Sequence, residues 1–147
     1  MDEIDRRIVQ LLQENGRVSL KTIAEKTYLS SPAVSARIEK LEKDGIILGY
    51  HAQIDLAKLG YPILAFVNLE VDPKDKERFY AYAQAVPNIL ECSCVTGEFS
   101  MLLKVAFAST EKLDVFIGQL QTFGRTRTQI VFSTHVGPRG IGAEENT

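Results

Sequence analysis

The chain has 147 residues, of which 45% are hydrophobic and 24% are charged, and its formal net charge is −2. This composition is typical of folded proteins, so wholesale disorder is excluded, and the length suffices for one ordinary domain or two small ones. No apolar run reaches the length of a transmembrane helix, and the acidic N-terminus lacks the apolar core of a secretion signal. The sequence therefore predicts a soluble cytoplasmic protein without a membrane partner.

The small net charge hides a local contrast. Residues 1–14 hold four acidic and two basic side chains, whereas residues 17–43 hold six basic and three acidic ones. A basic segment within an acidic chain is one feature of nucleic-acid binders, although charge alone does not decide the matter.

Three short helices are predicted in the first 45 residues. The first repeats apolar residues at helical spacing, at Ile4, Ile8, Leu11 and Leu12. Asp2 and Asp5 suit its first turn, because the positive end of a helix favours carboxylates, and Asn15–Gly16 ends it. A second, shorter helix begins after Ser19 as its N-cap.

The third helix follows a turn at Thr27–Leu29. Ser31 is its predicted N-cap, with Pro32 at the first position, where a missing N–H costs nothing. Its buried stripe consists of Val34, Ile38 and Leu41, and Asp44–Gly45 ends it. Residues 46–55 are then predicted to form a small β-hairpin around Gly49.

Two copies of a strand–helix–strand unit follow. The predicted strands cover residues 63–71, 89–96, 99–107 and 126–136, with one helix opened by Asp72–Pro73 and another capped by Ser109. Two such units with right-handed crossovers give a ferredoxin-like βαββαβ sandwich. Because the strands carry apolar residues on both faces while the helices cover one, we expect a second copy of the chain to cover the other.

The predicted fold class is therefore α+β, with an N-terminal winged helix-turn-helix and a C-terminal ferredoxin-like sandwich. The expected divisions are a winged helix-turn-helix domain at residues 1–55, a linker at 56–61, a ferredoxin-like oligomerisation domain at 62–137, and a flexible tail at 138–147.

Two short helices followed by a hairpin describe a DNA-binding motif whose second helix, Pro32–Lys43, enters the major groove of double-stranded DNA. Small residues opposite the buried stripe let the backbone approach base edges. Arg37 can pair with guanine or hold a phosphate, and Lys40 suits a phosphate. The predicted DNA-binding residues are Lys21, Ser31, Pro32, Ala33, Ser35, Ala36, Arg37 and Lys40. The alternative is an ordinary three-helix bundle with a solvated charged face.

Several segments, in the right order and at the right spacing, resemble the Lrp/AsnC family of leucine-responsive, or feast/famine, transcriptional regulators. They are Asn15–Ser19, Leu29–Val34, Arg37–Ile38, Leu41–Glu42, Gly45–Tyr50, Val95–Phe99, Leu102–Val105 and Thr126–Thr128. The resemblance implies a transcriptional regulator that binds DNA as a homodimer and often assembles further into tetramers of dimers. It also implies regulation by an amino acid held between subunits.

In this family the effector lies near the loop that here consists of Gly97, Glu98, Phe99 and Ser100. Family members commonly carry an aspartate at the position of Ser100, and an α-amino group needs such an acceptor, so we expect a changed effector class. Thr126 and Thr128, on one strand face, are further candidates for this site. The alternatives are a hairpin glycine at Gly97 and simple sheet contacts at the two threonines.

The two cysteines, Cys92 and Cys94, are predicted to be small buried hydrophobes, since a disulfide between such near neighbours is strained. A soft metal is the alternative, but a closed tetrahedral site would need both histidines, His51 and His135, to converge on this strand, so no metal and no cofactor are expected.

Two other functions compete with regulation. Relatives of the family act as tetrapyrrole decarboxylases, for which the sandwich offers His135, Arg125 and Arg127. However, no paired carboxylates, nucleophile motif or phosphate loop appears, so we expect no enzyme activity. The other alternative is an architectural protein that compacts DNA, and either DNA-binding function predicts a nucleoid-associated protein.

Overall fold

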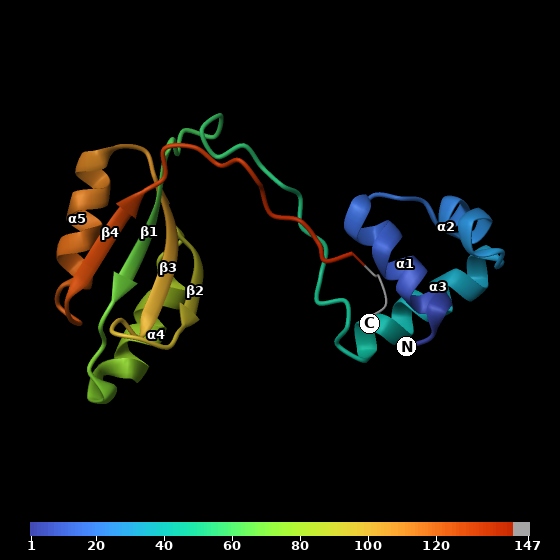
Figure 1. Cartoon of the computed structure of the whole chain (residues 1–147), viewed down its shortest axis with the longest axis horizontal. Helices are drawn as coiled ribbons and strands as arrows, with labels where there is room; N and C mark the ends of the chain where they lie inside the picture. Colours follow the sequence, from blue (N-terminus) through green and yellow to red (C-terminus); the bar gives the residue numbers. More distant parts are fainter. Residues whose placement is uncertain (143–147) are drawn as a thin grey trace. The chain divides into compact units, whose positions relative to one another are not determined.

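A computed structural model describes residues 1–142 of the chain (Figure 1). The backbone divides into two compact units. The first comprises Met1–Gln53 together with residues 136–142, and the second is Ile54–His135. The expected tail at 138–147 lies in part outside the described residues, and its described part groups with the first unit. No helix among residues 1–142 is long and apolar enough to cross a membrane.

The first unit contains the three predicted helices, α1 (Glu3–Glu14), α2 (Leu20–Thr27) and α3 (Ser31–Lys43). Asp2 and Asp5 form a reciprocal capping box at the start of α1, and Ser19 caps α2 as predicted. The predicted N-cap of α3 is wrong by one residue. Ser30 is the cap, because its hydroxyl accepts from the Ala33 N–H at 3.3 Å, and Ser31 begins the helix.

The predicted apolar stripes form the core of this unit. Its buried members are Ile8, Leu11, Ile23, Ala24, Val34 and Leu41, and Ile38 packs partly buried against them. The three helices therefore share one core, and this core fixes which face of α3 points outward.

The predicted hairpin at residues 46–55 is not formed in the described chain. Instead, the Ile47 N–H donates to the Leu41 carbonyl at the end of α3 (3.2 Å), and the Tyr50 hydroxyl donates to Glu42 (2.9 Å). The Gln53 amide reaches the Pro138 carbonyl at 2.7 Å. These contacts tie the segment to the end of α3 and to Pro138, and its two halves do not pair with each other as strands.

The second unit is a four-stranded antiparallel sheet in the order β2-β3-β1-β4. Its strands are β1 (Ile63–Leu69), β2 (Ile89–Cys94), β3 (Met101–Phe107) and β4 (Thr126–Ile130), and its helices are η1 (Pro73–Asp75), α4 (Lys76–Ala85) and α5 (Thr110–Leu120). This topology confirms the ferredoxin-like prediction. The predicted strand at 126–136 is too long. β4 ends at Ile130, and β1 begins at Ile63, which lies opposite residue 132, so β1 offers nothing to pair with residues 133–136.

Helices α4 and α5 cover one face of the sheet. Alternate residues of β1 and β3 point into this core with Phe79 of α4 and Leu113, Phe116 and Leu120 of α5. On the opposite face, the half-buried side chains of Leu64, Phe66 and Leu102 lie beside Ala106 without a covering helix. The sheet thus has one covered and one open apolar face, as the sequence predicts.

The predicted burial of the cysteines is wrong for this chain. Cys92 and Cys94 are free thiols and both are exposed. They pair with Leu103 and Met101 and therefore lie on the face of the sheet that the helices cover. However, their strand β2 is at the edge of the sheet. Of this strand, Ile89 is the residue that packs against the core, so the cover ends before the cysteines. No group of three potential metal ligands occurs within residues 1–142.

Candidate DNA interface and effector loop

The outward face of α3 carries small side chains. Ala36 lies about 160° around the helix from the buried Val34, since successive residues advance by about 100°. Pro32, Ala36 and Lys40 are exposed, whereas Ser31, Ala33 and Ser35 are half-buried. Lys21, in the first turn of α2, is exposed as well. This surface lets a groove-binding partner approach the helix backbone closely.

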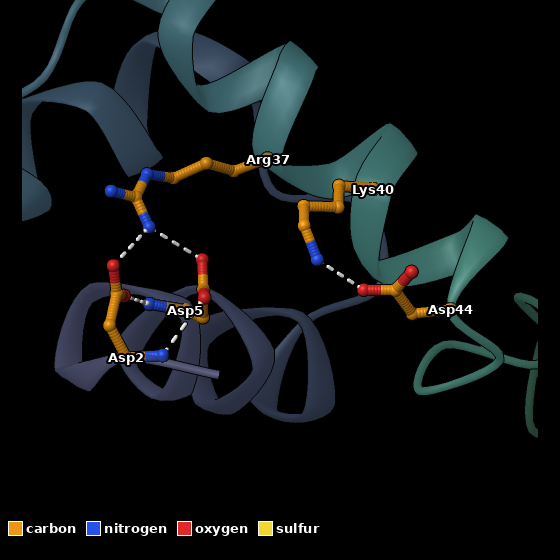
Figure 2. Close-up of polar contacts among 5 residues, drawn as sticks. All are labelled: Asp2, Asp5, Arg37, Lys40 and Asp44. Carbon is orange, nitrogen blue, oxygen red and sulfur yellow. Dashed lines mark hydrogen bonds and ion pairs between the residues drawn. The ribbon is translucent and has the colours of Figure 1, made fainter.

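Arg37 lies on the flank of α3 rather than on this face. One of its terminal nitrogens, Nη1, donates to Asp2 and to Asp5 of α1, at 2.7 Å each (Figure 2). The hydrogen bonds that Arg37 donates to these carboxylates raise the pKa of its guanidinium, and the one to Asp2 lowers the pKa of that carboxyl. The sequence pattern gave no sign of this contact, because 32 and 35 residues separate the partners.

Two other predicted DNA-contacting side chains have partners on α3 or at its C-cap. The Lys40 ammonium pairs with Asp44 one turn further on (Figure 2), and the Ser35 hydroxyl donates to Glu39 at 3.3 Å. The contact with Asp44 raises the pKa of Lys40. Both pairs lie on the surface, where they exchange readily with water or with another anion.

Tyr28 has a backbone conformation that the sequence does not predict. It is the C-cap of α2, in the turn that leads to α3, and its backbone is left-handed with φ 56° and ψ 33°. Its side chain is 96% exposed. A bulky residue in this conformation is strained, and here no packing offsets the strain.

The predicted effector residues gather at one end of the sheet. Leu69 at the end of β1 pairs both with Met101, which follows the loop Gly97–Ser100, and with Thr126 at the start of β4. Gly97 has φ 110°, a conformation that favours glycine. Thr128 is two residues further along β4 and exposed. The structure thus brings the loop and Thr126 together, with Thr128 beside them on the sheet edge.

Arg125 holds this loop to the sheet. Its guanidinium pairs with Glu98 (2.5 Å) and Glu70 (3.1 Å), and it lies 5.0 Å from the centre of the Phe99 ring. The hydrogen bond with Glu98 is the main cause of a raised pKa at Arg125. The sequence suggests Arg125 only as a group for enzyme chemistry, and its contact with Glu98 is not predicted by any local pattern.

Ser100 closes the other side of the loop. Its hydroxyl accepts from the Val71 N–H at 3.2 Å, and its carbonyl accepts from the Val95 N–H at 2.8 Å. Ser100 therefore links the start of β3 to the chain after β1 through a hydrogen bond, and it brings no charge to the site.

Comparison with known families agrees with both units. A family model described as a winged helix-turn-helix DNA-binding domain matches residues 1–47, and one described as the Lrp/AsnC ligand-binding domain matches residues 64–141. The chain belongs to the Lrp/AsnC family. It is a DNA-binding transcriptional regulator, which confirms the resemblance seen in the sequence.

Characterised Lrp/AsnC relatives match nearly end to end. The HTH-type transcriptional regulator LrpC of Bacillus subtilis is 35% identical over 133 residues, covering 90% of this chain and 92% of that protein. The solved structure of LrpC has a TM-score of 0.87 at 34% identity and covers 94% of this chain and 99% of that chain. The regulator FL11 of Pyrococcus horikoshii is 33% identical over 138 residues, which are 92% of this chain and 91% of the relative.

A third relative was solved with a small molecule. The feast or famine regulatory protein Rv3291c of Mycobacterium tuberculosis, complexed with L-methionine, has a TM-score of 0.89 at 32% identity. The match covers 96% of this chain and 98% of that chain.

Proposed function

We propose that this Lrp/AsnC regulator reads double-stranded DNA with the outward face of α3. The observation that carries the proposal is the exposed surface of Pro32 and Ala36, opposite a stripe fixed by burial of Val34 and Leu41. Such a surface fits the major groove, which is wide enough for one helix. Lys21 and Lys40, exposed beside it, supply charge for the DNA backbone.

The proposed functional unit is at least a homodimer. The open sheet face of Leu64, Phe66 and Leu102 is apolar, and a second copy presents the same face, which is self-complementary about a two-fold axis. Lys104 on this face has a partner in Glu91 of the same chain at 3.7 Å, so its own charge is partly neutralised, whereas Arg127 adds a positive charge to this face on the edge strand β4. Assembly into tetramers of dimers is proposed from the family resemblance.

The proposed effector is an amino acid or a related small molecule at a subunit interface near Gly97–Ser100. The methionine complex of a relative supports the class of ligand. In this chain Glu98 is paired with Arg125 and Ser100 is neutral, so neither offers a free carboxylate to an α-ammonium group. We therefore expect a ligand other than the simple apolar amino acids.

No catalytic activity is proposed. The groups considered for tetrapyrrole chemistry have other partners: Arg125 pairs with Glu98, and Arg127 lies 5.9 Å from the Phe99 ring centre. His135 contacts Ser133 at 3.2 Å. We further propose that the protein acts in the cytoplasm, at the nucleoid, where a DNA-binding regulator finds its operators.

The test is binding to an operator obtained by selection from random duplexes, measured by fluorescence anisotropy. Ala36→Glu places a carboxylate against the DNA, and we expect at least about a tenfold loss of affinity, since like charges at an interface cost several kcal/mol. Val115→Glu makes the same charge change at an exposed position of α5 and is the matched control. Equal affinity of the two variants would rule out α3 as the DNA-reading helix.

A further inference from the structure

We propose that Arg37 is a positioning residue: it holds α3 against the first turn of α1 through Asp2 and Asp5, and it does not itself read DNA. The inference rests on the proposed function, since it concerns how α3 is presented to DNA. It changes the role that the sequence suggests for this side chain.

The geometry separates Arg37 from the reading face. Its direction from the helix axis is about 60° from that of Val34, whereas Ala36 is about 160° away. Its side chain extends across to the start of α1, as Figure 2 shows, and is only 32% exposed. A guanidinium with this direction faces the neighbouring helix rather than the groove.

The carboxylates that Arg37 meets are themselves fixed. The Asp5 N–H donates to the Asp2 carboxylate at 2.8 Å, and the Asp2 N–H donates to the Asp5 carboxylate at 3.0 Å. This capping box belongs to the backbone of α1, so the arginine ties α3 to a rigid helix terminus. A single ion pair between flexible side chains has much less orienting power.

Electrostatics favours keeping this contact when DNA binds. Asp5 is only 16% exposed, and release of Arg37 would leave two carboxylates unpaired beside a polyanion. The free energy gained by a phosphate contact would be offset by that loss, because an unpaired, partly buried charge is costly. Arg37 therefore stays with Asp2 and Asp5 in the complex.

The two roles of Arg37 predict opposite effects of removing the carboxylates. If Arg37 contacts DNA, neutralising Asp5 frees the guanidinium, removes a repulsive charge and strengthens binding. If Arg37 positions α3, neutralising Asp5 loosens the helix and weakens binding. The sign of the change in affinity thus distinguishes the roles.

The experiment uses the full chain and the selected operator. Asp2→Asn and Asp5→Asn each remove a charge but keep an acceptor. Asparagine is as good an N-cap as aspartate at position 2, and at position 5 its amide oxygen can still accept from the N–H of residue 2, so the capping box of α1 is preserved. We expect the double variant to bind about five- to tenfold more weakly than wild type. Glu14→Gln, at the exposed far end of α1, neutralises a carboxylate of the same helix and should leave affinity unchanged.

Arg37→Lys provides a second, independent readout. Since the single nitrogen Nη1 contacts both carboxylates, a lysine ammonium can replace it. We expect the affinity of Arg37→Lys to lie within about twofold of wild type. Arg37→Ala should lose as much affinity as the double asparagine variant, and combining Arg37→Ala with the two asparagine substitutions should cause no further loss. A guanidinium that reads guanine with two donors is not replaced by lysine.

Stronger or unchanged binding by the asparagine variants, or equal losses with Arg37→Lys and Arg37→Ala, would overturn the inference. Urea unfolding of each variant verifies that it is folded at the assay temperature. The Ala36→Glu result separates the two proposals: if Ala36→Glu abolishes binding and Asp5→Asn strengthens it, α3 reads DNA but Arg37 does not act as proposed.

Discussion

Replacement of Tyr28 by glycine should stabilise the protein, because glycine adopts the left-handed conformation of this helix end without strain, although it is destabilising inside a helix. A non-glycine residue in the left-handed region costs about 1–2 kcal/mol, and Tyr28 is in this region with φ 56°. Its side chain is 96% exposed, so its removal forfeits almost no packing. Glycine increases the entropy of the unfolded chain, which costs about 0.4–1 kcal/mol. The balance is a gain of about 0.5–1 kcal/mol.

Urea unfolding followed by helical circular dichroism measures this gain. With an m-value of about 1 kcal/mol/M for a small unit, the midpoint should rise by about 0.5–1 M. Lys26→Gly, in the last turn of α2 and also exposed, is the matched control. It should destabilise by about 1 kcal/mol, because its backbone is ordinary helix. Destabilisation by Tyr28→Gly would refute the strain argument.

Four further results are expected. If the protein forms the proposed dimer, Leu102→Lys on the open sheet face should convert it to monomers in sedimentation, and a dimer that persists would place the interface elsewhere. Calorimetric titration with the twenty amino acids should show weak or no leucine binding by the wild type. Ser100→Asp should gain amino-acid binding, because it supplies a carboxylate. Tight leucine binding by the wild type would contradict the proposed effector site near Gly97–Ser100. Lys40→Ala should lower the magnitude of the slope of log binding constant against log salt concentration by about one, as expected for one phosphate contact. An unchanged slope would exclude that contact. Because Arg37 lowers the pKa of Asp2, the stabilisation from this pair is complete above the ordinary pKa of an aspartate and is lost as the pH falls below about 4. The urea midpoint of Asp2→Asn should therefore fall less steeply with decreasing pH in this range than that of the wild type. Equal pH dependence of the two midpoints would contradict this expectation.

Local patterns predicted most of the architecture. Apolar spacing predicts the buried stripe of Val34, Ile38 and Leu41, and the two repeated strand–helix–strand units predict the topology of the sheet. These features follow from burial alone, which imposes a period on the sequence. The open apolar face of the sheet was visible in the same alternation.

Contacts between distant residues were beyond such patterns. The pairing of Arg37 with Asp5 depends on how α1 packs on α3, and that of Arg125 with Glu98 depends on strand order. Exposure of Cys94 also depends on where the covering helices end along an edge strand. The sequence suggested which residue types were present, but the partners follow from tertiary structure.

The most direct test of the central claim, that α3 lies in the groove of its operator, is cleavage of DNA by an iron chelate tethered to this helix. The chelate is attached to Glu39→Cys, at an exposed position of α3, after both native exposed thiols are replaced by serine. The same attachment at Val115→Cys on α5 is the control. We predict cleavage from position 39 at two sites separated by about one helical turn or a multiple of it, and none from position 115. Cleavage from position 115 alone, or identical patterns from both, would contradict the account.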